Sequence, residues 1–253
     1  MNLAYAFREV KDTIPVVFLH GFLESSIMWR QLEVEDWNHS ILLIDLPGHG
    51  KSKTRLPQGE PSIDLMVDEV MEVLSSLKID KFHLIGHSMG GYLGLAIKKR
   101  FSSCKKLILM NSTYLADTDE KRRDRLRLAE LIYQAKDLII TNSIPRLFYK
   151  LTNEDQVVKD LINEALQISP DAIAYASIAM SKRPANLDVI LENKADVLII
   201  NGKYDPILNV EILQHDTIKF QLNCIELSNS GHMSHFEEPA LLKASIKKFI
   251  EIE

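Results

Sequence analysis

The sequence has 253 residues, 46% of them hydrophobic, which is enough for one large domain with a substantial core. The formal charge is −5, and the 30 lysines and arginines are interspersed with 35 acidic residues, so we expect no nucleic-acid partner. We expect no membrane partner either, because no apolar run reaches the roughly 20 residues of a membrane span and the first ten residues, interrupted by Arg8 and Glu9, are too short for a signal-peptide core.

Two cysteines, Cys104 and Cys224, lie beside strand-like runs. Free cysteines in such positions are typically buried, so we predict reduced thiols and no disulfide bridge. Because reduced thiols are typical of the cytoplasm, we expect a soluble cytoplasmic protein, either a monomer or a homodimer.

Apolar runs with strand character alternate along the chain with helical patterns. Residues 62–77 carry apolar side chains at helical spacing, and residues 239–250 do the same near the end of the chain. This alternation predicts an α/β fold with a mostly parallel central sheet and helices on both faces. The expected strands lie near residues 3–9, 15–20, 41–46, 82–87, 105–110, 196–201 and 222–228.

Two of the early strands run into glycine-containing loops. Residues 15–19 lead into His20-Gly21-Phe22, and residues 41–46 lead into the loop Asp45-Leu46-Pro47-Gly48-His49-Gly50. Asp45 is one candidate carboxylate for a catalytic site, but its setting in this loop favours a structural role.

The sequence Gly86-His87-Ser88-Met89-Gly90 stands between a strand-like run at 81–85 and a helical pattern at 92–100. This placement is typical of a nucleophile elbow, a strained turn that exposes a serine hydroxyl above the positive end of a helix. The flanking glycines are needed because side chains there would collide with the neighbouring strand and helix. We therefore predict Ser88 as a nucleophile and expect His87 to be a packing residue.

Residues 112–193 interrupt the alternation, because helical patterns follow one another there and no strand is expected. We predict helices over 117–140, from Asn153 with Gln156 in capping-box position, and from Ser169-Pro170. The charge run at 119–125 is expected to be a solvated helix face. The predicted organisation is an α/β core of residues 1–111 and 194–253, with residues 112–193 inserted as a helical cap.

Two polar residues follow late strands in positions equivalent to that of Ser88. Asp205 follows the run at 195–201, and His232 follows the run at 223–227. A serine becomes nucleophilic when a histidine takes its proton, and the histidine needs a carboxylate that fixes its tautomer. We therefore predict a catalytic triad of Ser88, His232 and Asp205.

With this order of Ser88, Asp205 and His232, and with its elbow motif, the chain resembles the α/β-hydrolase superfamily over nearly its whole length. The resemblance implies an oxyanion hole formed by the backbone N–H groups of Phe22 and Met89. It also implies that the cap covers the mouth of the site and lines the acyl or alcohol pocket. Candidate pocket residues are Phe148, Tyr149 and Met180, with packing inside the cap as the alternative role for each.

The predicted reaction is hydrolysis of a small carboxylic ester through an acyl-enzyme, the chemistry of carboxylesterases (EC 3.1.1). Related epoxide hydrolases and haloalkane dehalogenases carry an aspartate where this chain has Ser88, which argues against both chemistries. Carbon–carbon bond hydrolases, a menaquinone-pathway-like lyase and acyl-CoA thioesterases share the same motifs and stay open as alternatives. A small-molecule receptor or regulatory protein on the same fold is the alternative from another class.

His232 and His235 lie three residues apart, a spacing that a metal ion could use. No cysteine or carboxylate set accompanies them in a recognised ligand pattern. We therefore predict no metal site and no cofactor.

Overall fold

The computed structural model describes residues 3–251. Within them, seven strands form one sheet in the order β1-β3-β2-β4-β5-β6-β7, in which β1 is antiparallel to β3 and all other neighbours are parallel. The predicted mostly parallel α/β fold is confirmed. The strands are β1 (Tyr5–Arg8), β2 (Val16–Leu19), β3 (Ile41–Ile44), β4 (Phe82–His87), β5 (Cys104–Met110), β6 (Val197–Gly202) and β7 (Cys224–Leu227).

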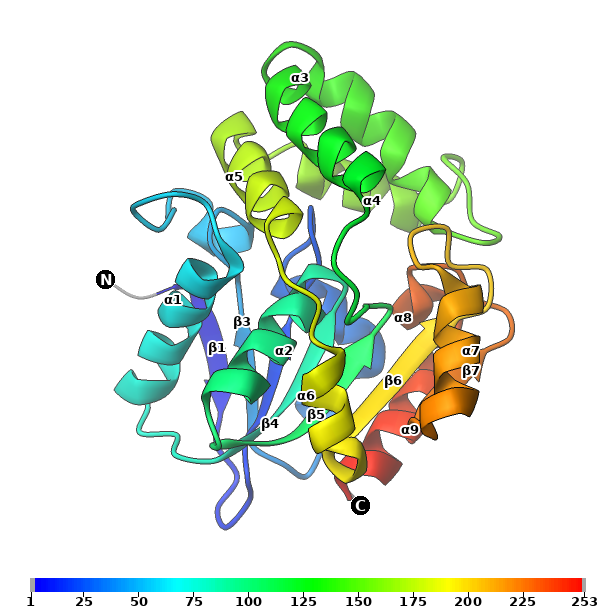
Figure 1. Ribbon diagram of the computed structural model, residues 1–253. Helices are drawn as coiled ribbons and strands as arrows, with labels where there is room; N and C mark the ends of the chain where they lie inside the picture. Colours follow the sequence, from blue (N-terminus) through cyan, green and yellow to red (C-terminus); the bar gives the residue numbers. More distant parts are fainter. Residues whose placement is uncertain (1–2, 252–253) are drawn as a thin grey trace.

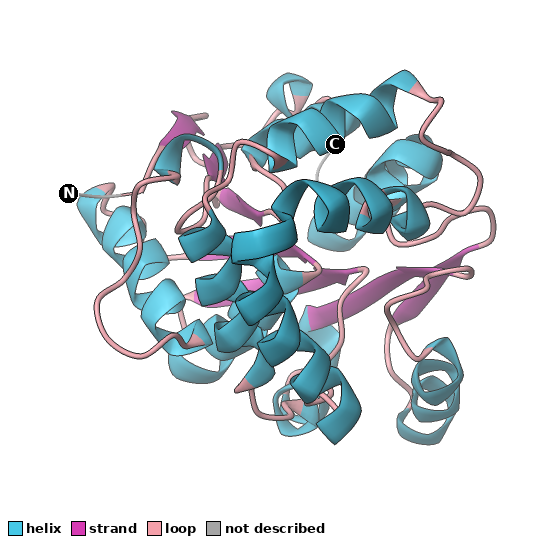
Figure 2. Ribbon diagram, turned by 90° about the horizontal axis from the view of Figure 1, so that it is seen from above, coloured by secondary structure: helices cyan, strands magenta, loops and turns pink. Residues whose placement is uncertain are grey.

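Helices cover both faces of the sheet (Figures 1 and 2). Because successive side chains of a strand point to opposite faces, Val17 and Leu19 of β2 pack in one core cluster while Val16 and Phe18 pack in another. The first cluster also holds residues of α1 (Ile63–Ser76), α2 (Met89–Arg100), α6 (Leu187–Glu192) and α7 (Val210–Phe220). The second holds residues of the short helix Ser26–Leu32 and of α9 (Pro239–Ile250), which α8 (Ser234–Glu237) precedes.

Three further helices lie above the carboxyl edge of the sheet (Figure 1). They are α3 (Asp119–Ser143), α4 (Gln156–Ala165) and α5 (Pro170–Ser181). All three contribute to a third cluster, and α5 also contributes Tyr175, Ala176, Ala179 and Met180 to the first. Within the described residues, the segment between β5 and β6 contains no strand, as predicted. The assignment of all of residues 112–193 to a cap stays a prediction, and α6 packs with the main core through Val189 and Ile190.

Three helices begin directly after a residue that caps them, whereas a fourth begins later than predicted. The side chains of Ser62, Thr118 and Ser169 each accept a hydrogen bond from a backbone N–H of the helix that follows. The predicted capping box of Asn153 is wrong: α4 begins at Gln156, and the Asp155 carboxylate accepts from the Thr152 N–H instead.

Both cysteines are free thiols. Along residues 3–251, every helix is too short or too polar to cross a bilayer.

Candidate active site

Ser88 occupies a strained turn between β4 and α2. Its backbone has φ of 49° and ψ of −111°, a conformation that non-glycine residues rarely adopt. A Cβ atom on Gly86 would collide with the backbone of Gly90, and one on Gly90 would collide with the carbonyl of Leu19. The predicted reason for the two glycines is therefore confirmed by the geometry of the turn.

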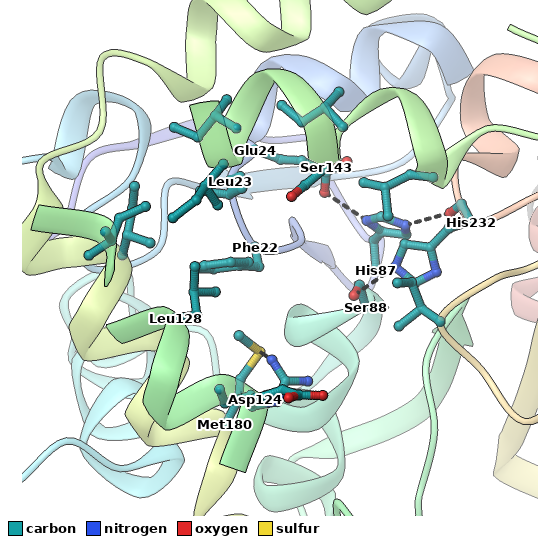
Figure 3. Close-up of a pocket in the computed structure, with 18 of the residues that line it drawn as sticks. Phe22, Leu23, Glu24, His87, Ser88, Asp124, Leu128, Ser143, Met180 and His232 are labelled. Carbon is teal, nitrogen blue, oxygen red and sulfur yellow. Dashed lines mark hydrogen bonds and ion pairs between the residues drawn. The ribbon is translucent and has the colours of Figure 1, made fainter. Parts of the chain in front are cut away.

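A continuous hydrogen-bond chain connects the three residues predicted as a triad (Figure 3 draws the bond to Ser88). Ser88 Oγ lies 2.9 Å from His232 Nε2, and His232 Nδ1 lies 2.8 Å from Asp205 Oδ2. Each residue follows a different parallel strand, β4, β6 or β7, so the shared carboxyl edge of the sheet brings them together. This arrangement allows a proton to pass from the hydroxyl to the imidazole.

Asp205 is buried and fully engaged by hydrogen bonds. One carboxylate oxygen accepts from the backbone N–H groups of Ile207 and Leu208, and the other accepts from His232 and from the Asn111 amide at 3.0 Å. Burial opposes ionisation, but the attraction of His232 and these hydrogen bonds outweigh it and lower the pKa of Asp205. The carboxylate is therefore charged and held in place at neutral pH.

Asn111 was not identified in the sequence, although it directly follows β5 at the same edge. Its amide donates to Asp205 and to the Gly231 carbonyl, which joins the loop of the carboxylate to the loop of His232. Its backbone has φ of 44°, in the left-handed region that asparagine tolerates. A polar residue immediately after a predicted strand was the one available signal.

The two predicted oxyanion donors lie at the ends of β2 and β4. Met89 is the first residue of α2, so its N–H has no partner within the helix. Phe22 lines the same cavity as Ser88 (Figure 3). Their joint action on a substrate oxygen stays a prediction.

Comparison with known proteins agrees with this fold. The family model described as the alpha/beta hydrolase fold matches residues 14–134. A provisionally named esterase/lipase of Haemophilus influenzae is 27% identical over 98% of this chain and 88% of its own length. The structure of a thermophilic esterase from Thermogutta terrifontis superimposes with a TM-score of 0.85 at 24% identity, covering 98% of this chain and 93% of the esterase.

The chain belongs to the α/β-hydrolase superfamily. Its curated relatives indicate an esterase/lipase-like hydrolase. They also include a provisionally named 2-succinyl-6-hydroxy-2,4-cyclohexadiene-1-carboxylate synthase of Bacillus subtilis, 25% identical over 93% of this chain and 89% of that protein.

In this α/β hydrolase, a cavity of about 340 Å³ lies between Ser88 and the helices above it. That volume is within the range of small-molecule sites. Most of its wall is aliphatic and comes from α3, from α5 and from the segment that joins α3 to α4. Its apolar lining includes Leu23, Leu128, Ile132, Ile139, Ile140, Ile144, Leu147, Ile173, Met180, Ile207 and Met233.

Of the three candidate pocket residues of the hydrolase, Met180 lines the cavity and the other two lie elsewhere. Phe148 is buried against Phe236, with ring centroids 6.0 Å apart. Tyr149 stacks on Tyr204 at 3.7 Å and is 40% exposed. The packing role that was the alternative for Phe148 is the one observed, because this residue belongs to the same apolar cluster as α3, α4 and α5.

The charge run at the start of α3 is only partly a solvated face in the folded hydrolase. Lys121, Asp124 and Arg125 line one end of the cavity. The Arg125 guanidinium is paired with the buried carboxylate of Asp117 at 2.6 Å, and the Lys121 ammonium donates to the Ile207 carbonyl. The cavity thus has a mostly aliphatic wall, and the lysine and arginine cations in its lining already have hydrogen-bond partners.

Asp45, the other carboxylate considered for the hydrolase triad, accepts hydrogen bonds from the backbone N–H groups of Ser26 and Lys51. These contacts are those of a loop-stabilising residue, in agreement with the structural role expected from its sequence setting.

Among the described residues, Glu24, His87 and His235 form a buried group whose potential metal-ligating atoms lie within 4.8 Å of one another. Glu24 Oε2 and His87 Nδ1 are 2.7 Å apart. Two ligand atoms on a tetrahedral zinc ion are separated by about 3.3 Å, since each lies about 2.0 Å from the metal. The spacing therefore suits a shared proton better than a metal ion. His232, the other histidine considered as a ligand, is engaged by Ser88 and Asp205.

Proposed function

We propose that this chain is a serine hydrolase that cleaves a small carboxylic ester through an acyl-enzyme. Ser88 is the nucleophile, His232 the general base and Asp205 the residue that orients the base. The observation that carries the proposal is the unbroken hydrogen-bond chain from Ser88 Oγ through the His232 ring to Asp205. A metal ion and a cofactor are not needed for this chemistry.

In the proposed reaction, His232 takes the hydroxyl proton of Ser88 as the oxygen attacks the ester carbonyl. The backbone N–H groups of Phe22 and Met89 stabilise the negative oxygen of the tetrahedral intermediate. His232 then gives the proton to the leaving alcohol, and a water molecule repeats the sequence to release the acid and restore Ser88.

The cavity favours an ester with an apolar acyl group. Aliphatic side chains form most of the wall next to Ser88, so an acyl chain would bury its methylene groups there. We propose residues 112–193 as a cap that shapes this space. Monomeric or homodimeric assembly and a cytoplasmic location remain part of the same proposal.

The relative named as a synthase makes a menaquinone-pathway-like lyase the second candidate. A multiply anionic substrate would need unpaired cations in the cavity. Of the lysine and arginine cations in its lining, Arg125 is already bound to Asp117, which also holds Arg183 at 2.8 Å, and Lys121 donates to the Ile207 carbonyl. This pairing favours an uncharged ester over the lyase substrate.

The test combines covalent labelling with turnover. A serine-directed fluorophosphonate is expected to label the wild type, and p-nitrophenyl esters of short and medium chain length are expected to be hydrolysed. Ser88→Ala should abolish the labelling and lower kcat on the order of 10⁶-fold, because the nucleophile is lost.

Ser143→Ala is the matched control, since Ser143 is a second serine in the lining of the same cavity. It should retain both labelling and turnover. Labelling that persists in Ser88→Ala would contradict the assignment. A wild type that neither reacts with the label nor hydrolyses any ester would favour the receptor alternative.

A further inference from the structure

His87 lies behind the proposed base with an oxygen atom at each of its ring nitrogens (Figure 3). Its Nδ1 is 2.7 Å from Glu24 Oε2, and its Nε2 is 3.0 Å from the backbone carbonyl of His232. The carbonyl only accepts hydrogen bonds, so Nε2 carries a proton, and an ionised Glu24 requires a second proton on Nδ1. With Glu24 ionised, this geometry is that of an imidazolium ion in a ring that is 1% exposed.

A buried cation of this kind needs an anion beside it, and Glu24 supplies one. The Glu24 carboxylate is 4% exposed and also accepts a hydrogen bond from the backbone N–H of Gly21. Burial opposes the charged form of each partner, but their mutual attraction raises the pKa of His87 and lowers that of Glu24 to about 2. The pair therefore has no net charge, although each of its two side chains is ionised.

The other titratable groups around His87 leave this charge balance intact. His235 packs against the ring at 5.1 Å, and burial lowers its pKa to about 3. Burial also lowers the pKa of His20, at the end of β2. The His232 ring lies 5.1 Å from His87, and the carboxylate of Asp205 acts on His87 as a further anion. His87 thus differs from His232, whose Nε2 faces the Ser88 hydroxyl, a group that can donate the hydrogen bond.

We propose that Glu24 and His87 are positioning residues, in which the carboxylate keeps the imidazole doubly protonated and the imidazolium holds the His232 carbonyl so that the base faces Ser88. This inference rests on the proposed function. It extends the expected packing role of His87, and it gives a role to Glu24, which the sequence did not assign.

The same pair connects two loops that the proposed reaction uses together. Glu24 binds the N–H of Gly21, the residue before the proposed oxyanion donor Phe22. His87 directly precedes Ser88 and binds the loop of His232. Loss of the charge on Glu24 would therefore loosen the base relative to the nucleophile, and kcat should fall more than KM changes.

Glu24→Gln tests the proposal because it keeps the shape of the side chain and removes its charge. Imidazole ¹⁵N NMR of the wild type at about pH 7 should show both nitrogens of His87 protonated, although a free histidine has a pKa of about 6.5. In Glu24→Gln the ring should be neutral, with one protonated nitrogen. We expect kcat to fall about tenfold to a hundredfold, the range for loss of a hydrogen bond to a charged group.

Glu164→Gln is the control, since Glu164 is a nearby carboxylate in another cavity lining and makes no contact with His87 in the described structure. It should leave the His87 spectrum and kcat unchanged. Glu24→Asp, which restores the charge on a shorter side chain, should recover the doubly protonated ring and part of kcat.

A wild-type His87 with one protonated nitrogen, or a variant Glu24→Gln with unchanged kcat and a neutral ring, would overturn the proposal. Failure of Ser88 to react with a fluorophosphonate would instead remove the proposed function. The NMR result distinguishes the two failures, because it does not depend on turnover.

Discussion

The loops at the carboxyl edge of the sheet and the helices above them are built in different ways. Backbone hydrogen bonds and buried polar side chains fix the loops: Ser88 N–H donates to the Met110 carbonyl, and Asp205 accepts four hydrogen bonds. The helices are held mainly by apolar packing in the third cluster, and α3 contains a kink at Ala135, where φ is −134° and ψ is 29°.

This difference separates two properties of the molecule. Chemistry needs atoms held within tenths of an ångström, which the parallel strands supply through their shared edge. Substrate shape needs only a wall of suitable volume, which aliphatic side chains on helices supply. We therefore expect changes in the loops to affect kcat and changes in the helices to affect which substrate fits.

The two regions meet at the loop that carries His232. Its backbone N–H donates to the carbonyl of Leu147, in the segment after α3. The Glu237 carboxylate accepts from the N–H groups of Gly231 and Tyr149, and so bridges the same two segments. The helices therefore have a direct connection to the position of the base.

The strongest test of this difference between the loops and the helices replaces one carboxylate in each region. Asp205→Asn should lower kcat by up to about 10⁴-fold without loss of fold, because the amide favours the wrong tautomer of His232. Asp124→Asn, which changes a carboxylate of α3 in the cavity lining, should leave kcat within a few-fold of the wild type. Steady-state kinetics of both variants on one ester check this, and equal losses of kcat would break the comparison.

A second test concerns stability at the junction of the two regions. Asp117, whose side chain is fully buried, binds Arg125 of α3 and Arg183 after α5. Asp117→Asn should lower the free energy of unfolding by about 3–5 kcal/mol, because two largely buried guanidinium groups lose their anion. Urea unfolding measures the loss, and hydrogen exchange should show it first in α3 and α5.

The exposed Asp119, which pairs with Arg122 three residues later, is the control. Asp119→Asn should lower the free energy of unfolding by less than about 0.5 kcal/mol. Similar losses for the two variants would show that the buried ion pairs do not hold the helices in place.

The pH dependence of the Asp117 effect follows from its pKa. Burial raises that pKa, but the hydrogen bond from Arg183 and the charges of Arg125 and Arg183 outweigh it, so the folded-state pKa is lowered. The stabilisation is complete above the unfolded pKa of about 3.9 and is lost as pH falls through the lower folded value. The difference in free energy of unfolding between wild type and Asp117→Asn should therefore be constant near neutral pH and become smaller below about pH 4.

The smallest expected effect is on substrate length. Leu128 of α3 lines the cavity, so Leu128→Ala enlarges it. The kcat/KM for longer acyl chains should therefore rise about tenfold relative to that for shorter ones. This is the effect of one to two methylene groups in an apolar pocket. Leu131→Ala changes a half-exposed residue of the same helix and should leave the profile unchanged. Rates for a series of p-nitrophenyl esters check the shift, and parallel profiles for both variants would place the acyl group outside this cavity.

Much of the scaffold could be predicted because its signals are local. A buried strand appears as a short apolar run, and the elbow at Ser88 needs glycines at fixed positions. Asp205 and His232 could be predicted from their places after strands, since parallel strands end at one edge. The start of α4 was misjudged because several polar residues in succession can each cap a helix.

The sequence by itself determined the strands, the strained serine turn and the polar residues that follow each strand, because backbone geometry and apolar periodicity act over a few neighbouring residues. Only the tertiary structure decided that Asn111 contacts Asp205, that Glu24 contacts His87, and that Met180 lines the cavity while Tyr149 stacks on Tyr204. These contacts join residues far apart in the chain, and the direction of each side chain depends on how whole helices pack. Local patterns carry no information about that packing.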